Sequence, residues 1–344
     1  MTLKKFLTAA LSTVLLIGST AGCGNETLST ETANEFINVA NDPTRELYAE
    51  YNEVFEPVWH EVSGQTISFK NTHGAGSSQA STVASGAEAD VVSLSIAYDV
   101  YTIEQAGLIR PGWMKLFPHN SAPYTSTIVF LVRKGNPKNI RDWDDLIRAD
   151  ISLIALNPKI SGGARWNYLA AWEYARHQNN GDDDKAREFV QAMYANVEIL
   201  NDTSRETLKT FIDDRKGDVL IAWENEALRI VRDMPTEYEI VTPSISILAE
   251  PTMAVVDEVV DRKGTRRLAE WYIRYLYSTA GQEIAAQNFY RPRNTEILAR
   301  HADIFKPLTL VTLEDAFGDW KDVQKKHFDD GGVFDQFKLQ QPKE

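Results

Sequence analysis

The sequence predicts an α/β fold with two lobes. The chain has 344 residues, and the roughly 310 that follow a polar N-terminal segment are more than one hydrophobic core usually holds. Short apolar segments of strand length alternate with segments in which apolar residues recur at helical spacing. The sequence has no repeat period and no low-complexity segment.

The first strand-to-helix junction follows residues 38–41. Asp42 is a good N-cap and Pro43 a favoured first helical residue, and Leu47 and Tyr51 then recur at helical spacing. These signals predict a helix start, but by themselves they do not indicate a ligand.

A loop of small residues forms the second junction. Gly74, Gly76 and Ser77 lie between an alternating strand at residues 66–70 and a helix-like segment at residues 80–84. The loop lacks the Gly-Lys-Ser/Thr ending of a nucleotide P-loop, and it has no third glycine at dinucleotide spacing. Nucleotide binding is therefore poorly supported.

The third junction is the most informative part of the chain. Residues 151–156 predict a short buried strand, Ser161 is a good N-cap, and residues 164–177 predict an amphipathic helix. Gly162 and Gly163 have no Cβ, so an anion can approach their N–H groups closely where the helix dipole favours negative charge. The alternative is an ordinary turn that binds nothing.

The fourth junction has a capping box. A short strand at residues 197–200 leads to Thr203 and Glu206, which have the spacing of the box, and apolar residues follow. Capped helix starts are common, so the four junctions alone are also compatible with a purely structural role.

Long segments of the chain, taken in order, resemble the periplasmic sulfate-binding proteins of ATP-binding cassette importers, a family that includes thiosulfate binders. The resemblance runs from about Ile37 to Phe337 and is carried by residues 42–48, 88–92, 97–100, 121–137, 161–169, 217–226 and 281–286. It implies a type II periplasmic-binding-protein fold, in which two strands cross between the lobes and the ligand lies in the cleft between them.

The resemblance also implies how the chain is divided. Residues 35–122 and 248–344 would form the first lobe and residues 123–247 the second, with crossing strands in residues 125–133 and 245–256. We expect the C-terminal segment from Glu314 onward, which contains Phe317, Trp320 and Phe328, to pack on the first lobe. We also expect a monomer.

The ligand implied by the resemblance is a sulfate held without a counter-ion, a cofactor or a metal. Carried over by position, its donors are the amides of Asp42, Gly76, Gly162, Gly163 and Ser204, the Ser161 hydroxyl and the Trp223 indole N–H. Without the resemblance, Trp223 at the end of an apolar segment would be interpreted as a core residue.

The chain departs from the family pattern at two of these positions. Gly76 stands where the family usually has serine, which keeps the amide but removes a hydroxyl contact or shifts it to Ser77. Ser204 stands where the family usually has alanine, and it adds a hydroxyl near the expected ligand. Arg165 and Arg205, one turn into their helices, either brace the loops behind the ligand or are solvated.

A site made only of donors explains selectivity without a positive charge. Sulfate is fully ionised at neutral pH and can only accept hydrogen bonds. Hydrogen phosphate carries a proton that would face a donor, and leaving it unpaired costs roughly 1–3 kcal/mol. The Asp42 carboxylate would accept that proton if it faced the cleft, but we expect it to cap its own helix.

The N-terminal segment predicts export. Residues 1–22 have a basic start and an apolar stretch too short to span a membrane, as in a secretory signal peptide. Cys23, the only cysteine, follows a segment that resembles a bacterial lipobox, and we expect it to be lipidated. Thr20 stands where leucine is usual, so ordinary signal-peptidase cleavage is the alternative. Residues 23–34 are a polar, flexible tether.

The charge excludes some partners. The formal net charge of −13 argues against nucleic acid and against an anionic membrane surface. It also opposes long-range attraction of a sulfate dianion, so capture would depend on local dipoles in a closed cleft.

Catalysis and metal binding have little support. Ser161 and His73 do not lie in a Gly-x-Ser-x-Gly elbow, and the six histidines show no paired ligand spacing. The sequence therefore predicts a binder that delivers sulfate or thiosulfate to the permease subunits of an ATP-driven importer. The alternatives are molybdate, tungstate or phosphate as the ligand, or an oxyanion sensor.

Overall fold

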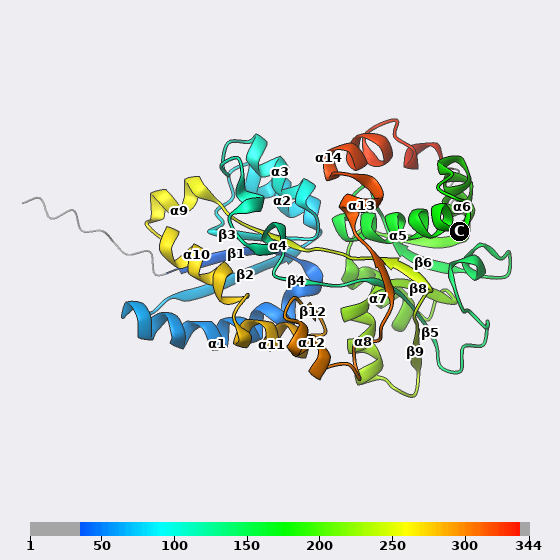
Figure 1. Ribbon diagram of the computed structural model, residues 1–344, viewed down its shortest axis with the longest axis horizontal. Coiled ribbons are helices and arrows are strands. Elements are labelled where there is room, and N and C mark those ends of the chain that lie inside the picture. Colours follow the sequence, from blue (N-terminus) through cyan, green and yellow to red (C-terminus); the bar gives the residue numbers. More distant parts are fainter. Residues whose placement is uncertain (1–34, 338–344) are drawn as a thin grey trace, which may run out of the picture. The chain divides into compact units, whose positions relative to one another are not determined.

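The computed structural model describes residues 35–337 and consists of helices packed on two main β-sheets (Figure 1). The predicted signal peptide, Cys23 and tether lie outside the described residues. Within residues 35–337, every helix is too short or too polar to cross a membrane. The predicted α/β class is confirmed.

The first lobe is built on a four-stranded sheet with the order β11-β3-β1-β2. The strands are β1 (Glu35–Asn41), β2 (Ser68–Gly74), β3 (Val91–Leu94) and β11 (Thr252–Val255). β1, β2 and β3 are parallel, and β11 is antiparallel to β3. Parallel strands place their carboxyl ends at one edge, where the next helices begin.

Helices cover both faces of this sheet (Figure 1). They are α1 (Arg45–Ser63) and α10 (Arg266–Tyr275) on one face, and α2 (Gly76–Ala84) and α3 (Ala97–Gln105) on the other. Phe36 and Ala40 of β1 pack into the α1 side, whereas Val39 packs into the α2 and α3 side. This alternation is the period of two expected for a strand buried on both faces.

The second lobe is built on a five-stranded sheet with the order β7-β6-β8-β5-β9. Its strands are β5 (Ile128–Arg133), β6 (Leu153–Leu156), β7 (Val197–Asn201), β8 (Val219–Trp223) and β9 (Tyr238–Val241). Its covering helices are α5 (Gly162–Gln178) on one face, and α7 (Ser204–Ile212) and α8 (Glu224–Asp233) on the other.

Two adjacent segments connect the lobes. One runs from β4 (Tyr124–Thr125) to β5, and the other runs from β10 (Ile245–Ile247) to β11. Ser126 and Ala249 pair in antiparallel orientation, with both N–H···O distances at 3.0 Å. The predicted two-lobed fold is confirmed. A third segment, residues 309–311, pairs with β10 and leads the chain from Arg291–Pro292, which pairs with β4, to the aromatic residues that pack on α5, so the predicted number of two crossings is too low. The residue bounds predicted for each lobe stay a prediction.

The remaining elements complete the lobes and the C-terminal segment. They are η1 (Asp42–Thr44), η2 (Trp113–Lys115), α4 (Pro118–Ser121), η3 (Trp143–Ile147), α6 (Asp183–Ala195), α9 (Asp257–Lys263), α11 (Thr279–Gln287), β12 (Arg291–Pro292), α12 (Thr295–Arg300), β13 (Thr309–Val311), α13 (Leu313–Phe317), α14 (Trp320–Val323), η4 (Gln324–Phe328) and η5 (Phe334–Gln336).

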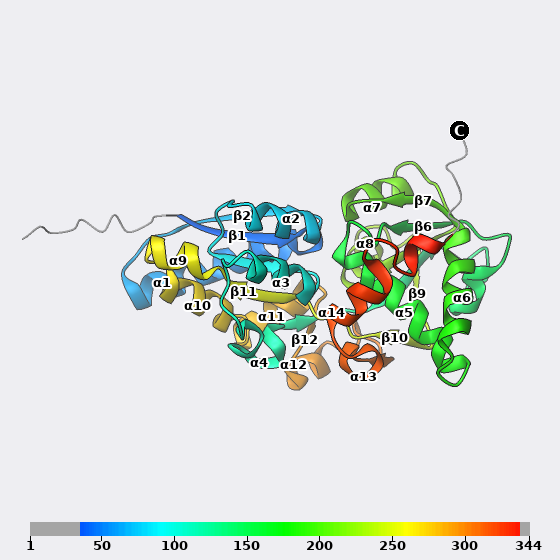
Figure 2. The same ribbon diagram turned by 90° about the horizontal axis from the view of Figure 1, so that it is seen from above.

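The C-terminal segment packs on α5 of the second lobe through its aromatic side chains, and both views place α14 between α3 and α5 (Figure 1, Figure 2). The Trp320 ring meets Trp166 edge-on at 4.8 Å between centroids, and Phe328 meets Tyr168 at 5.0 Å. The segment also contacts α3 of the first lobe, where the Lys321 ammonium lies 4.2 Å from the centre of the Tyr101 ring. The prediction that it packs on the first lobe is therefore confirmed only in part, because Trp320 and Phe328 pack on α5.

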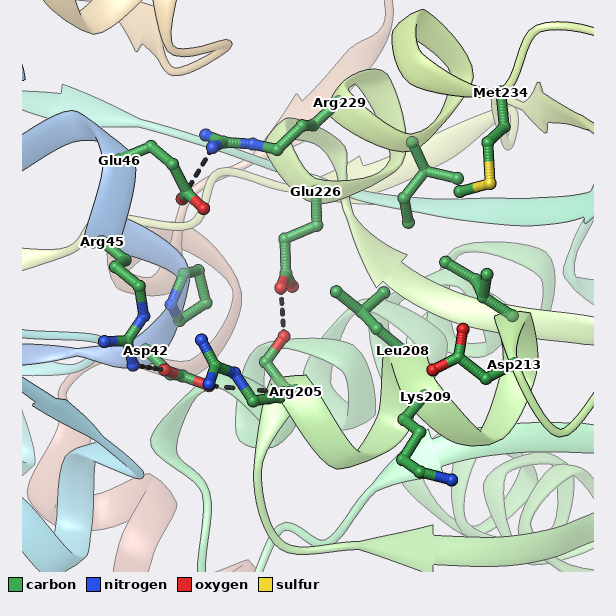
Figure 3. Close-up of a pocket in the computed structure, with 14 residues that line it drawn as sticks. Asp42, Arg45, Glu46, Arg205, Leu208, Lys209, Asp213, Glu226, Arg229 and Met234 are labelled. Atoms are coloured by element: carbon green, nitrogen blue, oxygen red, sulfur yellow. Dashed lines mark hydrogen bonds and ion pairs between the residues drawn. The ribbon is translucent and has the colours of Figure 1, made fainter.

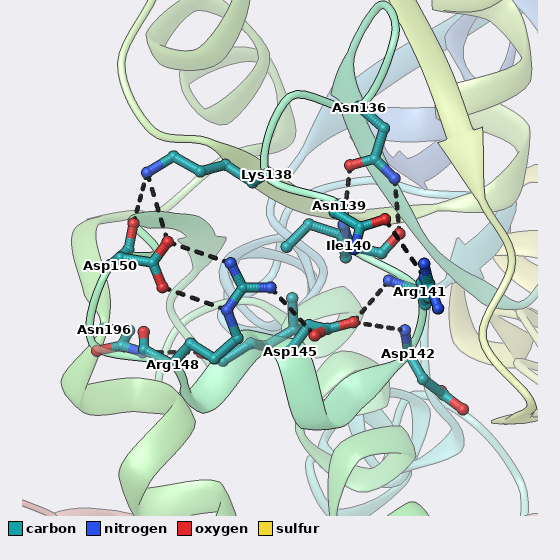
Figure 4. A network of polar contacts seen from close by, with 11 residues as sticks. Asn136, Lys138, Asn139, Ile140, Arg141, Asp142, Asp145, Arg148, Asp150 and Asn196 are labelled. Carbon is teal, nitrogen blue, oxygen red and sulfur yellow. Dashed lines mark hydrogen bonds and ion pairs between the residues drawn. The ribbon is translucent and has the colours of Figure 1, made fainter.

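A polar network fixes the chain where it enters β6 (Figure 4). Asp142 and Asp145 form a capping box around η3. Arg148 binds Asp145 and Asp150, each at 3.1 Å, and the Asn196 side-chain amide donates to the Arg148 carbonyl at 2.8 Å. These contacts hold the start of the strand whose far end leads to Ser161.

Candidate functional site

A small cavity lies between the lobes, where several helices begin. It is lined by Asn41, Asp42, Pro43, Gly74, Ala75, Gly76, Ser95, Leu156, Ser161, Gly163, Thr203, Ser204 and Trp223. Most of the residues predicted to bind the ligand are in this set. Gly162 and Ser77 are not, and both lie behind the cavity against Asp99.

Helix starts aim their free amides at this cavity. The turn η1 begins at Asp42, α2 at Gly76, α5 at Gly162 and α7 at Ser204. The first N–H groups of a helix have no carbonyl partner within the helix and carry partial positive charge. Among the described residues, no hydrogen bond is donated by the amides of Gly76, Gly162, Gly163 or Ser204.

Ser161 is the N-cap of α5, as predicted. Its hydroxyl oxygen accepts a hydrogen bond from the Ala164 amide at 3.4 Å. The Ser161 side chain is buried, and accepting this bond leaves its own proton available to an acceptor in the cavity.

Trp223 ends β8 with its side chain buried beside the cavity. Its indole N–H donates to the Gly163 carbonyl at 3.1 Å, so in this structure that donor already has a partner. The next residue, Glu224, accepts two hydrogen bonds from Arg291 at 2.6 and 2.8 Å. This buried ion pair holds the end of β8 in place, although burial raises the pKa of Glu224.

Asp99 of α3 lies behind the glycines of both lobes. A Cβ added to Gly76 would come within 2.8 Å of Asp99 Oδ2, and one added to Gly162 within 2.7 Å. The carboxylate accepts a hydrogen bond from the Ser77 hydroxyl at 2.8 Å and lies 3.9 Å from Arg165. Burial outweighs both favourable contacts and raises the pKa of Asp99 to about 6.

The two predicted bracing arginines differ. Arg165 is buried, its Nε donates to the Pro158 carbonyl at 2.9 Å, and its guanidinium packs over Phe328. It therefore braces the loop before α5, and burial lowers its pKa. The Arg205 side chain is exposed. Its main-chain amide donates to Asp42 Oδ2 at 3.3 Å.

The prediction that Asp42 caps its own helix is wrong. The chain enters η1 one residue earlier, so that Asn41 occupies the N-cap position without making a side-chain cap. The Asp42 carboxylate instead accepts from Arg45 at 2.6 Å and from the first turn of α7 in the second lobe. It thereby joins the two lobes next to the cavity.

Ser204 lines both this cavity and a larger cleft of about 540 Å³. Figure 3 draws the residues that line the larger cleft. Its hydroxyl donates to Glu226, so its side chain is turned away from the smaller cavity and only its amide remains for a ligand there. Across the cleft, Arg229 pairs with Glu46 of α1 at 2.6 Å. Burial, and to a lesser extent the Asp42 carboxylate, raises the pKa of Glu226 to about 7.

Asn41 and Asp99 are polar residues of this site that were not predicted from the sequence. Asn41 is buried and lines the cavity. Its position as a polar residue at the end of an apolar strand is a sequence signal that could have identified it. Asp99 gave no comparable signal, because an acidic residue in the first turn of a helix usually faces solvent.

The comparisons with known proteins agree with this geometry. A family model described as bacterial extracellular solute-binding protein matches residues 39–291. The sulfate-binding protein of Escherichia coli K12 is 54% identical over 303 residues, which cover 88% of this chain and 92% of that protein. A thiosulfate-binding protein of Pseudomonas aeruginosa is 45% identical over 306 residues, with the same two coverages.

A solved structure has the same fold. The sulfate-binding protein SubI from Mycobacterium tuberculosis H37Rv matches with a TM-score of 0.76 and 30% identity, over 86% of this chain and all of that one. The family model's match, residues 39–291, includes every helix start around the cavity. The chain belongs to the family of bacterial extracellular solute-binding proteins.

Proposed function

We propose that this protein captures sulfate outside the cytoplasmic membrane and delivers it to the permease of an ATP-binding cassette importer. One observation carries the proposal: amides at helix starts of both lobes, with the Ser161 hydroxyl, surround a cavity whose lining residues include no Lys, Arg or His. A fully ionised dianion suits such a set of neutral donors. Relatives named for sulfate and thiosulfate support this ligand class.

The proposed ligand contacts are those predicted from the sequence, with two changes. The amides of Asp42, Gly76, Gly162, Gly163 and Ser204 and the hydroxyl of Ser161 would donate directly. Trp223 would donate only by exchanging its bond to the Gly163 carbonyl for one to the anion. Ser77 would act through Asp99 and not by direct contact.

The same geometry argues for binding without catalysis. A serine nucleophile needs a base that accepts its proton, whereas among residues 35–337 the Ser161 hydroxyl makes only the bond that it accepts from the Ala164 amide. His73 contacts the Asn41 carbonyl at 3.4 Å. We therefore assign Ser161 the role of a hydrogen-bond donor to the ligand.

We also propose that Cys23 anchors the exported protein through a lipid.

Calorimetry of the signal-free protein tests the proposal. The protein is unfolded and refolded by dialysis to remove carried-over anion, then titrated with sulfate, thiosulfate, hydrogen phosphate and molybdate. We expect one-to-one binding of sulfate or thiosulfate and much weaker binding of hydrogen phosphate. Preference for molybdate or hydrogen phosphate would overturn the assigned ligand, and no binding of any anion would overturn the function.

Gly163→Asp is the matched variant for the same titration. A Cβ at Gly163 makes only ordinary contacts, 3.4 Å from Trp223 and 3.5 Å from Ser161, and the carboxylate of the new side chain adds negative charge at the cavity. Sulfate binding should be lost while the protein remains folded. Retained binding would mean that this cavity is not the site.

A further inference from the structure

Asn41 is the one cavity-lining side chain whose amide is buried without any partner. It is the last residue of β1 and only 1% exposed. Among the described residues, neither its Oδ1 nor its Nδ2 makes a hydrogen bond. A buried amide without partners is strongly unfavourable, so such a group in a folded protein calls for a physical explanation.

The main chain around Asn41 is fixed, which also fixes the direction of its side chain. Asn41 pairs with Gly74 at the end of the parallel β1–β2 ladder. Its carbonyl accepts from the Thr44 hydroxyl at 2.7 Å and contacts His73 at 3.4 Å. Because these bonds hold the backbone, the amide cannot reach solvent by a small shift of the strand end.

A second buried asparagine on the same strand shows what an ordinary structural role looks like. Asn38 is also 1% exposed, and its Nδ2 has no hydrogen-bond partner among the described residues, but its Oδ1 accepts from the Ser93 hydroxyl at 2.9 Å inside the lobe. Asn38 lies three residues earlier, so its side chain points to the opposite face of the strand. It is not among the residues that line the cavity.

We propose that Asn41 is a further ligand-binding residue, whose side-chain amide contacts the bound oxyanion. The inference rests on the proposed function. With sulfate or thiosulfate, Nδ2 would donate and add a side-chain donor to the main-chain amides. With an oxyanion that carries a proton, the amide would turn so that Oδ1 accepts that proton.

This residue would therefore reduce the selectivity that a donor-only site provides. The helix amides and Ser161 can only donate toward the cavity, so they leave the proton of hydrogen phosphate unpaired. Asn41 brings an acceptor to the same space without bringing negative charge. It is thus a specificity-determining position, and the ratio of sulfate to hydrogen phosphate affinity measures its effect.

Asn41→Leu tests the inference, with Asn38→Leu as the matched control. Leucine has a similar size but no polar atoms. We expect Asn41→Leu to weaken sulfate about 10- to 100-fold and hydrogen phosphate by a larger factor. The melting temperature of its anion-free form should stay equal or rise, because an unpaired amide has been removed. Asn38→Leu should lower the melting temperature, since Ser93 loses its acceptor, and should leave both affinities within about 3-fold.

The outcomes separate this inference from the proposed function. If the unaltered protein binds no oxyanion, the proposed function fails. If the unaltered protein binds sulfate, and Asn41→Leu binds each anion with the same affinity as the unaltered protein, only the role of Asn41 is overturned. Should Asn41→Leu fold poorly, Asn41→Asp keeps the side-chain size but replaces the donor with a negative charge. It should weaken sulfate more than about 100-fold, and unchanged affinity would again overturn the inference.

Discussion

At the scale of single residues, Gly162 and Gly163 are adjacent but have different neighbours. A Cβ on Gly162 would meet Asp99 Oδ2 at 2.7 Å and Ile96 at 3.1 Å, both from the first lobe, whereas a Cβ on Gly163 meets nothing closer than 3.4 Å. Gly162→Ala should therefore weaken sulfate by about 1–3 kcal/mol, the usual cost of overpacking. Gly163→Ala should leave affinity within about 3-fold, because it keeps the amide and causes no clash.

Calorimetry of both variants checks this pair. Alanine stabilises a helix relative to glycine, so neither variant should unfold, and circular dichroism in the absence of anion would establish this. Equal affinities for Gly162→Ala and Gly163→Ala would mean that Gly162 does not meet Asp99 when anion is bound.

At the scale of elements, the C-terminal segment covers the outer face of α5. Phe328 is buried against Tyr168 and also lies under the Arg165 guanidinium. Phe328→Ala should lower the free energy of unfolding by about 3–5 kcal/mol, the usual cost of removing a buried aromatic ring. Urea titration would measure it.

Phe317→Ala is the control for that measurement. Phe317 belongs to the same segment but is only partly buried, so its removal should cost clearly less. A similar small loss for both variants would mean that the segment contributes little to the stability of the second lobe.

Local signals in the sequence predicted the helix starts well where a side chain makes the cap. Ser161 and the pair Thr203 and Glu206 lie as expected, because capping is decided within one turn. The start of α2 at Gly76 was predicted four residues too late, since its N-cap, Ala75, has no capping side chain. Local sequence therefore fixes a helix start only when the cap is a side chain.

Contacts between distant residues were beyond local reasoning. The Ser204 hydroxyl donates to Glu226 and the Ser77 hydroxyl donates to Asp99, so neither faces the cavity. The partner of a hydroxyl depends on which acceptors the folded chain brings near, and helix spacing does not contain that information. For the same reason the sequence did not indicate that Trp223 would donate to Gly163.

At the scale of the whole molecule, contacts across the cleft set how firmly the lobes close. Trp166 of α5 donates its indole N–H to the Ser95 carbonyl of the first lobe at 2.8 Å, and both groups are buried. Trp166→Phe removes this bond without touching the proposed ligand donors. Binding requires closure, so sulfate should weaken by about 1–2 kcal/mol.

Trp172→Phe is the matched control. Trp172 is equally buried on α5, but its indole donates to Asp183 of the same lobe at 3.2 Å. Calorimetry should therefore find its sulfate affinity unchanged. If both variants weaken sulfate alike, the effect comes from α5 packing and not from the contact between the lobes.

The place of Asp99 between helices of both lobes connects capture of an anion to the movement of protons. In the closed cleft the pKa of Asp99 is raised to about 6, whereas a solvated aspartate has a pKa of about 3.9. If opening of the cleft exposes Asp99 to solvent, its carboxylate is almost fully ionised at pH 6 in the open form and partly protonated in the closed form, so closure would take up a fraction of a proton. The heat of capture would then vary with the ionisation enthalpy of the buffer at pH 6, and the part due to Asp99 would disappear at pH 8, where Asp99 stays ionised in both forms. Each delivery to the permease would return the proton to the surrounding solution.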